Sequence, residues 1–253
     1  MLLFKHGDGT RRGGLVGESI GGTITGSFAT GAVSPPQSGS IYTGGLVGQN
    51  RNSYDGLITG TITQSFASGK VSASPYGSGG LVGQNAGAIS LSHSESAIDG
   101  GGGLVGVNMG TISQSYADGT MSAGGGGLVG ENDGTILNSY ATEAVNGGYS
   151  GGLVGANSNV ISQSYSTGAS SDGGLIGYSY PHENLSDTYW DMDTSGITDL
   201  GKGSGNIPYD AGITGITSAQ LKQKLPKGFD PAIWGEKKRI NGGFPYLLAN
   251  PPS

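Results

Sequence analysis

The stretch GGLVGVNMGTISQSYADGTM, residues 102–121, contains the pattern that most of the chain repeats. Its first block is Gly-Gly-Leu-Val-Gly, once written with Ile in place of Val. The block occurs seven times, with its leucine at Leu15, Leu46, Leu81, Leu104, Leu128, Leu153 and Leu175. Four of the six intervals are 22 to 25 residues, and the other two, 31 and 35, contain insertions. Self-similarity at such a period is typical of repeat architectures, so we expect the insertions to be surface loops.

Two further short blocks follow each first block. One has the form Thr-Ile-x-x-Ser-aromatic-Ala, and the other is an apolar residue five positions after the aromatic one. Short pieces rich in Ile, Val, Thr and Tyr favour strands, and glycine at their junctions disfavours helix. One coil cannot bury its apolar side chains alone, whereas stacked coils align like residues in columns. The sequence predicts an all-β fold, a parallel β-helix (solenoid) of about seven coils over residues 13–190.

Particular positions of the repeat predict particular columns. Asparagine recurs four residues after the leucine in five coils, at Asn50, Asn85, Asn108, Asn132 and Asn157. Asparagine amides can hydrogen-bond along a stack of strands, so we expect an asparagine ladder at one corner. His93 occupies a column otherwise held by Phe or Tyr, which favours a stacking role over a ligand role. Strict alternation does not place Ile112 and Ser115 on one face, so a bend is expected somewhere between the second block's ends.

The two ends of the chain lie outside the repeat. Residues 1–12 are interpreted as a leader or fragment edge, because the repeats begin abruptly. Residues 191–253 are predicted to form a C-terminal cap with one short helix, since residues 217–226 carry a Thr-x-x-Gln capping box and a proline stop. Trp234, Phe244 and Tyr246 add bulky apolar groups. Such a segment would cover the open strand edge at the end of a β-helix.

Composition and charge exclude several classes of function. The 253 residues include 53 glycines and no cysteine, so disulfides, thiolate metal sites and cysteine nucleophiles are excluded. Twelve acids and no Lys or Arg lie between Val71 and Gly201. The negative charge of this stretch is unsuited to binding the phosphates of a nucleic acid. No apolar run is long enough for a membrane span. The acidic stretch suggests calcium as a partner, and the alternative is a solvated surface that only maintains solubility.

A possible calcium site begins at Asp191. Asp191, Asp193, Ser195, Gly196 and Asp199 match positions 1, 3, 5, 6 and 9 of a twelve-residue calcium loop. Position 12, where a bidentate Glu is needed, is a lysine, and no helices are predicted to flank the loop. The sequence therefore offers Asp191, Asp193, Ser195 and Asp199 as metal ligands, with an ordinary Asx-rich turn as the alternative.

A possible catalytic site lies beside it, at the junction of the repeats and the cap. His182 or Asp187 would serve as the base, and Trp190 would form an apolar wall. We expect uniform coils to offer no concavity, so a pocket is predicted at this junction instead. With calcium these groups would suit a metal-assisted hydrolase of a glycosidic, ester or lactone bond. Glu131 and Asp133 form a second carboxylate pair, interpreted as a solvated corner.

The repeated Gly-Gly-Leu-Val-Gly block resembles the GLUG-motif repeat of large secreted bacterial proteins, including filamentous-haemagglutinin-like adhesins. The resemblance covers residues 13–190, and the segments 189–191 and 241–247 are similar to what often follows such repeats. It implies an extracellular or cell-surface adhesion module that binds carbohydrate or another surface. The repeat is a scaffold without a family active site, which favours a non-enzyme, and the hydrolase is the alternative. We expect a monomer or part of a longer chain, although no signal peptide is visible.

Overall fold

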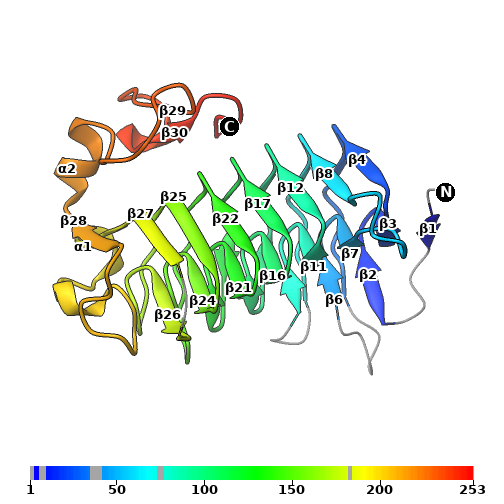
Figure 1. The fold of residues 1–253 in the computed structure, drawn as a ribbon, viewed down its shortest axis with the longest axis horizontal. Coiled ribbons are helices and arrows are strands. Elements are labelled where there is room, and N and C mark those ends of the chain that lie inside the picture. The colour runs from blue at the N-terminus through cyan, green and yellow to red at the C-terminus, as the bar shows by residue number, and fades with distance from the viewer. Residues whose placement is uncertain (1–2, 6–9, 35–41, 73–76, 182–183, 253) are drawn as a thin grey trace.

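The computed structural model describes residues 3–5, 10–34, 42–72, 77–181 and 184–252, and most of them form stacked parallel strands (Figure 1). Each of the seven repeats places one strand in the same parallel sheet. Equivalent residues pair in register, so Val82 lies between Val47 and Val105. The predicted all-β parallel β-helix is therefore confirmed. None of the helices in the described ranges is long and apolar enough to cross a membrane.

The first block of each repeat builds an eight-stranded sheet. Its strands, in spatial order, are β1 (Leu3–Lys5), β3 (Val16–Ile20), β7 (Val47–Arg51), β11 (Val82–Ala86), β16 (Val105–Asn108), β21 (Val129–Asn132), β24 (Val154–Asn157) and β26 (Ile176–Ser179). Only β1 runs antiparallel to its neighbour among these strands, pairing with β3. The residues just before each block form a five-stranded sheet of β2 (Arg11–Gly13), β6 (Tyr42–Gly44), β10 (Ser78–Gly79), β15 (Gly101–Gly102) and β20 (Gly125–Gly126).

The second block builds a larger sheet that turns a corner within every coil. Its isoleucine row consists of β4 (Thr23–Thr25), β8 (Thr61–Thr63), β12 (Ala88–Ser90), β17 (Thr111–Ser113), β22 (Thr135–Leu137), β25 (Val160–Ser166) and β27 (Asn184–Asp191). Its aromatic row consists of β5 (Phe28–Ala29), β9 (Phe66–Ala67), β13 (His93–Ser94), β18 (Tyr116–Ala117) and β23 (Tyr140–Ala141), and β25 and β27 continue through both rows. The third block pairs in β14 (Ala97–Ile98) and β19 (Thr120–Met121).

The expected bend lies at one residue of the second block. Gln64, Leu91, Gln114, Asn138, Gln163 and Asp187 all have positive φ there. A left-handed residue reverses the alternation of side chains, so the isoleucine before it and the serine after it both point inward. Ile112 and Ser115 are accordingly both buried. The sequence did not reveal this position because non-glycine residues hold it in most coils.

Two columns inside and beside the core follow the predictions. The asparagine ladder is fully buried, and the amide nitrogens of the first four asparagines each donate to the amide oxygen of the asparagine in the next coil at 2.8–2.9 Å. The aromatic residues stack with ring centroids 4.8–5.3 Å apart from Phe28 to Tyr165. His93 lies in this stack, within 2° of parallel to both neighbours. Its predicted stacking role is confirmed.

The C-terminal segment continues the stack before it folds back. After α1 (Met192–Ser195) and η1 (Leu200–Lys202), strand β28 (Ile213–Ile216) pairs in parallel with β27, so stacking extends beyond residue 190. The predicted helix is α2 (Ser218–Gln223), and its capping box is present. Helix α1 was not predicted, because its one turn depends on a local cap and has no apolar period.

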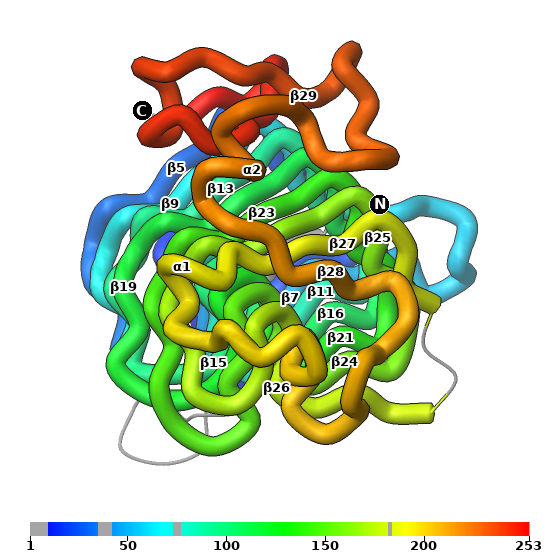
Figure 2. The backbone as a smooth tube through the Cα atoms, turned by 90° about the vertical axis from the view of Figure 1, so that its left-hand side faces the viewer, coloured from blue at the N-terminus to red at the C-terminus, as the bar shows by residue number. Residues whose placement is uncertain are grey.

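The rest of the segment lies along one flank of the solenoid. It contains β29 (Trp234–Gly235), η2 (Asn241–Gly243) and β30 (Tyr246–Leu247), and it passes over the aromatic row (Figures 1 and 2). The Trp234 ring lies 6.1 Å from that of Tyr140 and 5.8 Å from that of Tyr165. The Asn250 amide donates to the backbone carbonyls of Ser92 and Gln114, which lie just before the aromatic row. The segment therefore covers a flank as well as an end, because the bulky aromatics there need an apolar surface.

Candidate functional site

The carboxylates of Asp191 and Asp193 bind the starts of two helices. Asp191 caps α1 by accepting from the Asp193 backbone N–H at 2.9 Å, and it also accepts from the Ser218 hydroxyl at 2.5 Å. Asp193 accepts from the Ser218 backbone N–H at 2.9 Å. Anions at helix N-termini satisfy unpaired backbone donors. The structure thus brings these two predicted ligands onto one partner, where they fasten α2 to the end of the solenoid.

The other two predicted metal ligands each serve a separate local turn. The Ser195 hydroxyl accepts from the Ile197 backbone N–H at 3.1 Å, and the Asp199 carboxylate accepts from the Gly201 backbone N–H at 2.9 Å. Within the described ranges no group of three or more His, Asp or Glu residues is placed to hold a metal ion. The hydrogen bonds match the Asx-turn alternative, and the calcium site stays a prediction.

The predicted catalytic residues are only partly visible. His182 lies outside the described residues. Asp187 is half-buried beneath the loop at Gly228, whose backbone approaches the Asp187 side chain so closely that a β-carbon there would clash. Trp190 is fully buried at the end of the solenoid core and donates to the Ile197 carbonyl at 3.0 Å. The prediction that Trp190 walls an open pocket is therefore wrong, and the hydrolase stays a prediction.

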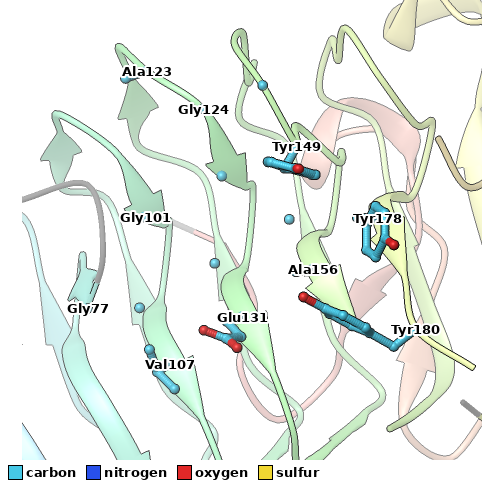
Figure 3. A pocket seen from close by; sticks show the side chains of 15 residues that line it. Gly77, Gly101, Val107, Ala123, Gly124, Glu131, Tyr149, Ala156, Tyr178 and Tyr180 are labelled. Carbon is cyan, nitrogen blue, oxygen red and sulfur yellow. The ribbon is translucent and has the colours of Figure 1, made fainter. Parts of the chain in front are cut away.

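A groove lies on the side of the coils themselves (Figure 3), so the expectation that uniform coils offer no concavity is also wrong. Its volume is about 520 Å³. One wall comes from β15, β20 and the turn residues in line with them, and the other from the outward face of β16, β21, β24 and β26. Glycine brings the two walls together, since a β-carbon on Gly106 would lie 2.6 Å from the backbone at Gly77.

The groove opens because side chains that fill the same corner in earlier coils are absent from later ones. In the first three coils Arg11 donates to Gln49, and Gln49 donates to Gln84, which forms a polar row between the two sheets. The positions of these glutamines are taken by Val107, Glu131, Ala156 and Tyr178 in the last four coils. The facing positions are glycines in the middle coils. The glycines of one wall and the shorter side chains of Val107 and Ala156 on the other leave the open space.

Three tyrosines stand at the C-terminal end of the groove. The ring of Tyr178 meets Tyr149 edge-on at 5.6 Å and Tyr180 at 5.0 Å. Tyr149 is 66% exposed and Tyr180 is 44% exposed. Tyr149 also has a left-handed backbone, with φ 56°, which is uncommon for a bulky residue. The fold itself does not require these aromatic groups, which makes them candidates for ligand contact.

Glu131 is the ionisable carboxylate among the described residues that line the groove. Partial burial raises its pKa, and the nearby charge of Asp133 raises it further. The Asp133 carboxylate is exposed and accepts from the Ser158 hydroxyl at 2.6 Å, outside the groove lining. Both side chains are exposed, which agrees with the interpretation of a solvated corner, and Glu131 also lines the groove.

Sequence reasoning missed the three groove tyrosines. The signal that would have found them is a departure from the repeat, because no other coil carries an aromatic residue at the position of Tyr178. Comparison of the chain with protein-family models, with curated proteins and with solved structures finds no match. The functional argument therefore depends on the geometry of the groove.

Proposed function

We propose that this chain is a carbohydrate-binding adhesion module of a secreted or cell-surface protein, and that the groove is its binding surface. The observation that carries the proposal is the cluster of Tyr149, Tyr178 and Tyr180 beside a glycine-rich floor. A tyrosine ring offers an apolar face and a polar hydroxyl. Sugar rings likewise combine apolar C–H faces with hydroxyl groups at their edges, so the two surfaces are complementary.

The position of the groove supports an extended ligand. Its lining crosses successive coils, from Gly77 to Tyr180, along the stacking direction. Solenoids commonly bind elongated partners along such a surface, and a mostly apolar hollow with a few polar groups is a usual ligand site. The resemblance of the repeat to those of bacterial adhesins points to the same class of protein and to an extracellular location.

A glycan array followed by titration calorimetry tests the proposal. We expect at least one oligosaccharide to bind, and Tyr180→Ala to weaken it about tenfold, which corresponds to ~1.4 kcal/mol. Tyr209→Ala is the matched control, because Tyr209 is also exposed but does not line the groove. Circular dichroism would verify that both variants stay folded. Failure of every glycan to bind, or equal losses in the two variants, would contradict the proposal.

A further inference from the structure

The charged side chain that lines the groove is negative. The described lining of the groove includes Glu131 and contains no Lys, Arg or His. The surrounding sequence from Val71 to Gly201 has twelve acids and no Lys or Arg. The arginines of the early coils lie elsewhere, with Arg51 held 3.0 Å from the Glu18 carboxylate. A ligand in the groove therefore meets negative charge without a compensating cation from the protein.

The length of the groove sets the size of the ligand. Val107, Glu131, Ala156 and Tyr178 occupy the same position in four successive coils. At a strand spacing of about 4.8 Å, the three intervals span roughly 14 Å. Each hexose of an extended glycan adds a length close to this spacing between neighbouring coils. The floor of the groove thus suits three or more sugar rings in a line.

The order of side chains along the floor sets where each ring would lie. A ring placed on the Tyr178 and Tyr180 pair would be followed by one over Ala156, whose small side chain leaves room. The next ring would lie beside Glu131, about two coil spacings, or roughly 10 Å, from Tyr178. Glu131 is exposed at the groove, and a carboxylate there favours a cationic partner and disfavours an anionic one.

Building on the proposed function, we propose that the groove selects linear glycans with free amino groups, with one ring on the tyrosine pair and an amine paired with Glu131. Charge complementarity is the reason for this choice, because an ammonium group would neutralise the Glu131 carboxylate and donate hydrogen bonds to it. An acidic glycan would bring a second carboxylate to the same place, where the described lining has no cation to pair with it.

Calorimetry at low ionic strength with three linear tetrasaccharides tests this specificity. The probes are β-1,4-linked glucosamine, its neutral N-acetylated counterpart and an acidic galacturonic acid tetramer. We expect the amino tetramer to bind about tenfold more tightly than the neutral one, and the acidic one to give no heat. The affinity for the amino sugar should also increase from dimer to tetramer.

Two variants separate the role of Glu131 from a general charge effect. Glu131→Gln should reduce binding of the amino tetramer to the level of the neutral one and leave the neutral one unchanged. Asp133→Asn removes an equal charge outside the groove lining and should change binding less than twofold. If Glu131→Gln keeps the preference, or the acidic tetramer binds as well, the amine specificity is wrong while the glycan-binding function stands. If no tetramer binds and no array glycan responds to Tyr180→Ala, both fail.

Discussion

The first three coils and the last four are built from the same repeat, yet they expose opposite surfaces. In the early coils the corner between the eight-stranded and five-stranded sheets is filled by Arg11, Gln49 and Gln84, while the aromatic stack is open at Phe28. In the later coils the corner is an open groove, while the stack is buried beneath Trp234. The repeat thus determines the backbone, and the positions that vary decide which surface is free to bind.

The largest expected effect is on the covered part of the aromatic stack. Trp234→Ala removes a fully buried side chain that contacts Tyr140, Tyr165 and Phe229. Truncation of a buried tryptophan costs about 3–5 kcal/mol of stability. Urea unfolding followed by circular dichroism should show this loss of stability. Backbone amides of the C-terminal segment should also exchange hydrogen faster in the variant. A change below about 1 kcal/mol would mean that the segment is not held by this contact.

The next effect concerns Glu143, which is buried in the later coils where other coils carry small residues. Burial raises its pKa to about 8 from 4.5. Between these two values the folded state keeps the proton while the unfolded chain has lost it. The free energy of unfolding should therefore fall as pH rises, by at most about 1.4 kcal/mol per pH unit, and level off above pH 8.

Glu143→Gln should flatten this pH dependence in urea unfolding measured from pH 5 to pH 9. In this variant the free energy of unfolding should still fall slightly with pH at the acidic end of the range, because burial also raises the pKa of Asp118, to about 6. Asp118→Asn in the same background should reduce that remainder further. An unchanged slope in Glu143→Gln would show that this carboxyl is ionised in the folded protein.

A smaller effect is expected at the asparagine ladder, which both halves of the molecule share. Asn108→Ala leaves the amide of Asn85 and the amide oxygen of Asn132 without their ladder partners. An unsatisfied buried polar group costs about 1–3 kcal/mol. Thermal unfolding should show the loss, and Thr111→Ala, an exposed change in the same coil, is the control. Equal melting temperatures for the two variants would contradict this role.

The uncovered end of the aromatic stack should matter much less than the covered end. Phe28 stacks on Phe66 but is 63% exposed. Its burial is too small for a large hydrophobic contribution, so Phe28→Ala should cost less than about 1 kcal/mol. Urea unfolding beside Trp234→Ala gives the direct comparison. A loss as large as that of Trp234→Ala would show that the early coils are covered in solution.

The smallest effect on stability is expected where the groove is made to resemble the early coils. Ala156→Gln places in the groove the residue type that Gln49 and Gln84 have at the same position. Ala156 is half-buried and faces open space, so stability should change by less than about 0.5 kcal/mol. Glycan binding should nevertheless fall about tenfold or more in calorimetry. Unchanged binding would move the binding surface away from the groove.

Short-range and repeated features of this protein could be predicted from the sequence. The columns of Leu, Ile and Asn follow from the period alone, because identical residues in stacked coils must meet. The capping box at Thr217 is equally local, since both of its hydrogen bonds join residues three apart. The stacking of His93 followed from its place in the aromatic column. These features depend on neighbours that the repeat itself specifies.

The features that depend on contacts outside the repeat were decided only by the tertiary structure. Asp191 and Asp193 have the spacing of a calcium loop, but their carboxylates bind Ser218, at the start of a helix far along the chain. Glu131 and Tyr178 lie in strands of the eight-stranded sheet and Tyr149 lies in a turn, and the folded coils place all three around one groove. The sequence by itself thus determined the stacked coils, because each residue's partner is its own copy. The tertiary structure decided where the groove lies, because its two walls come from different sheets.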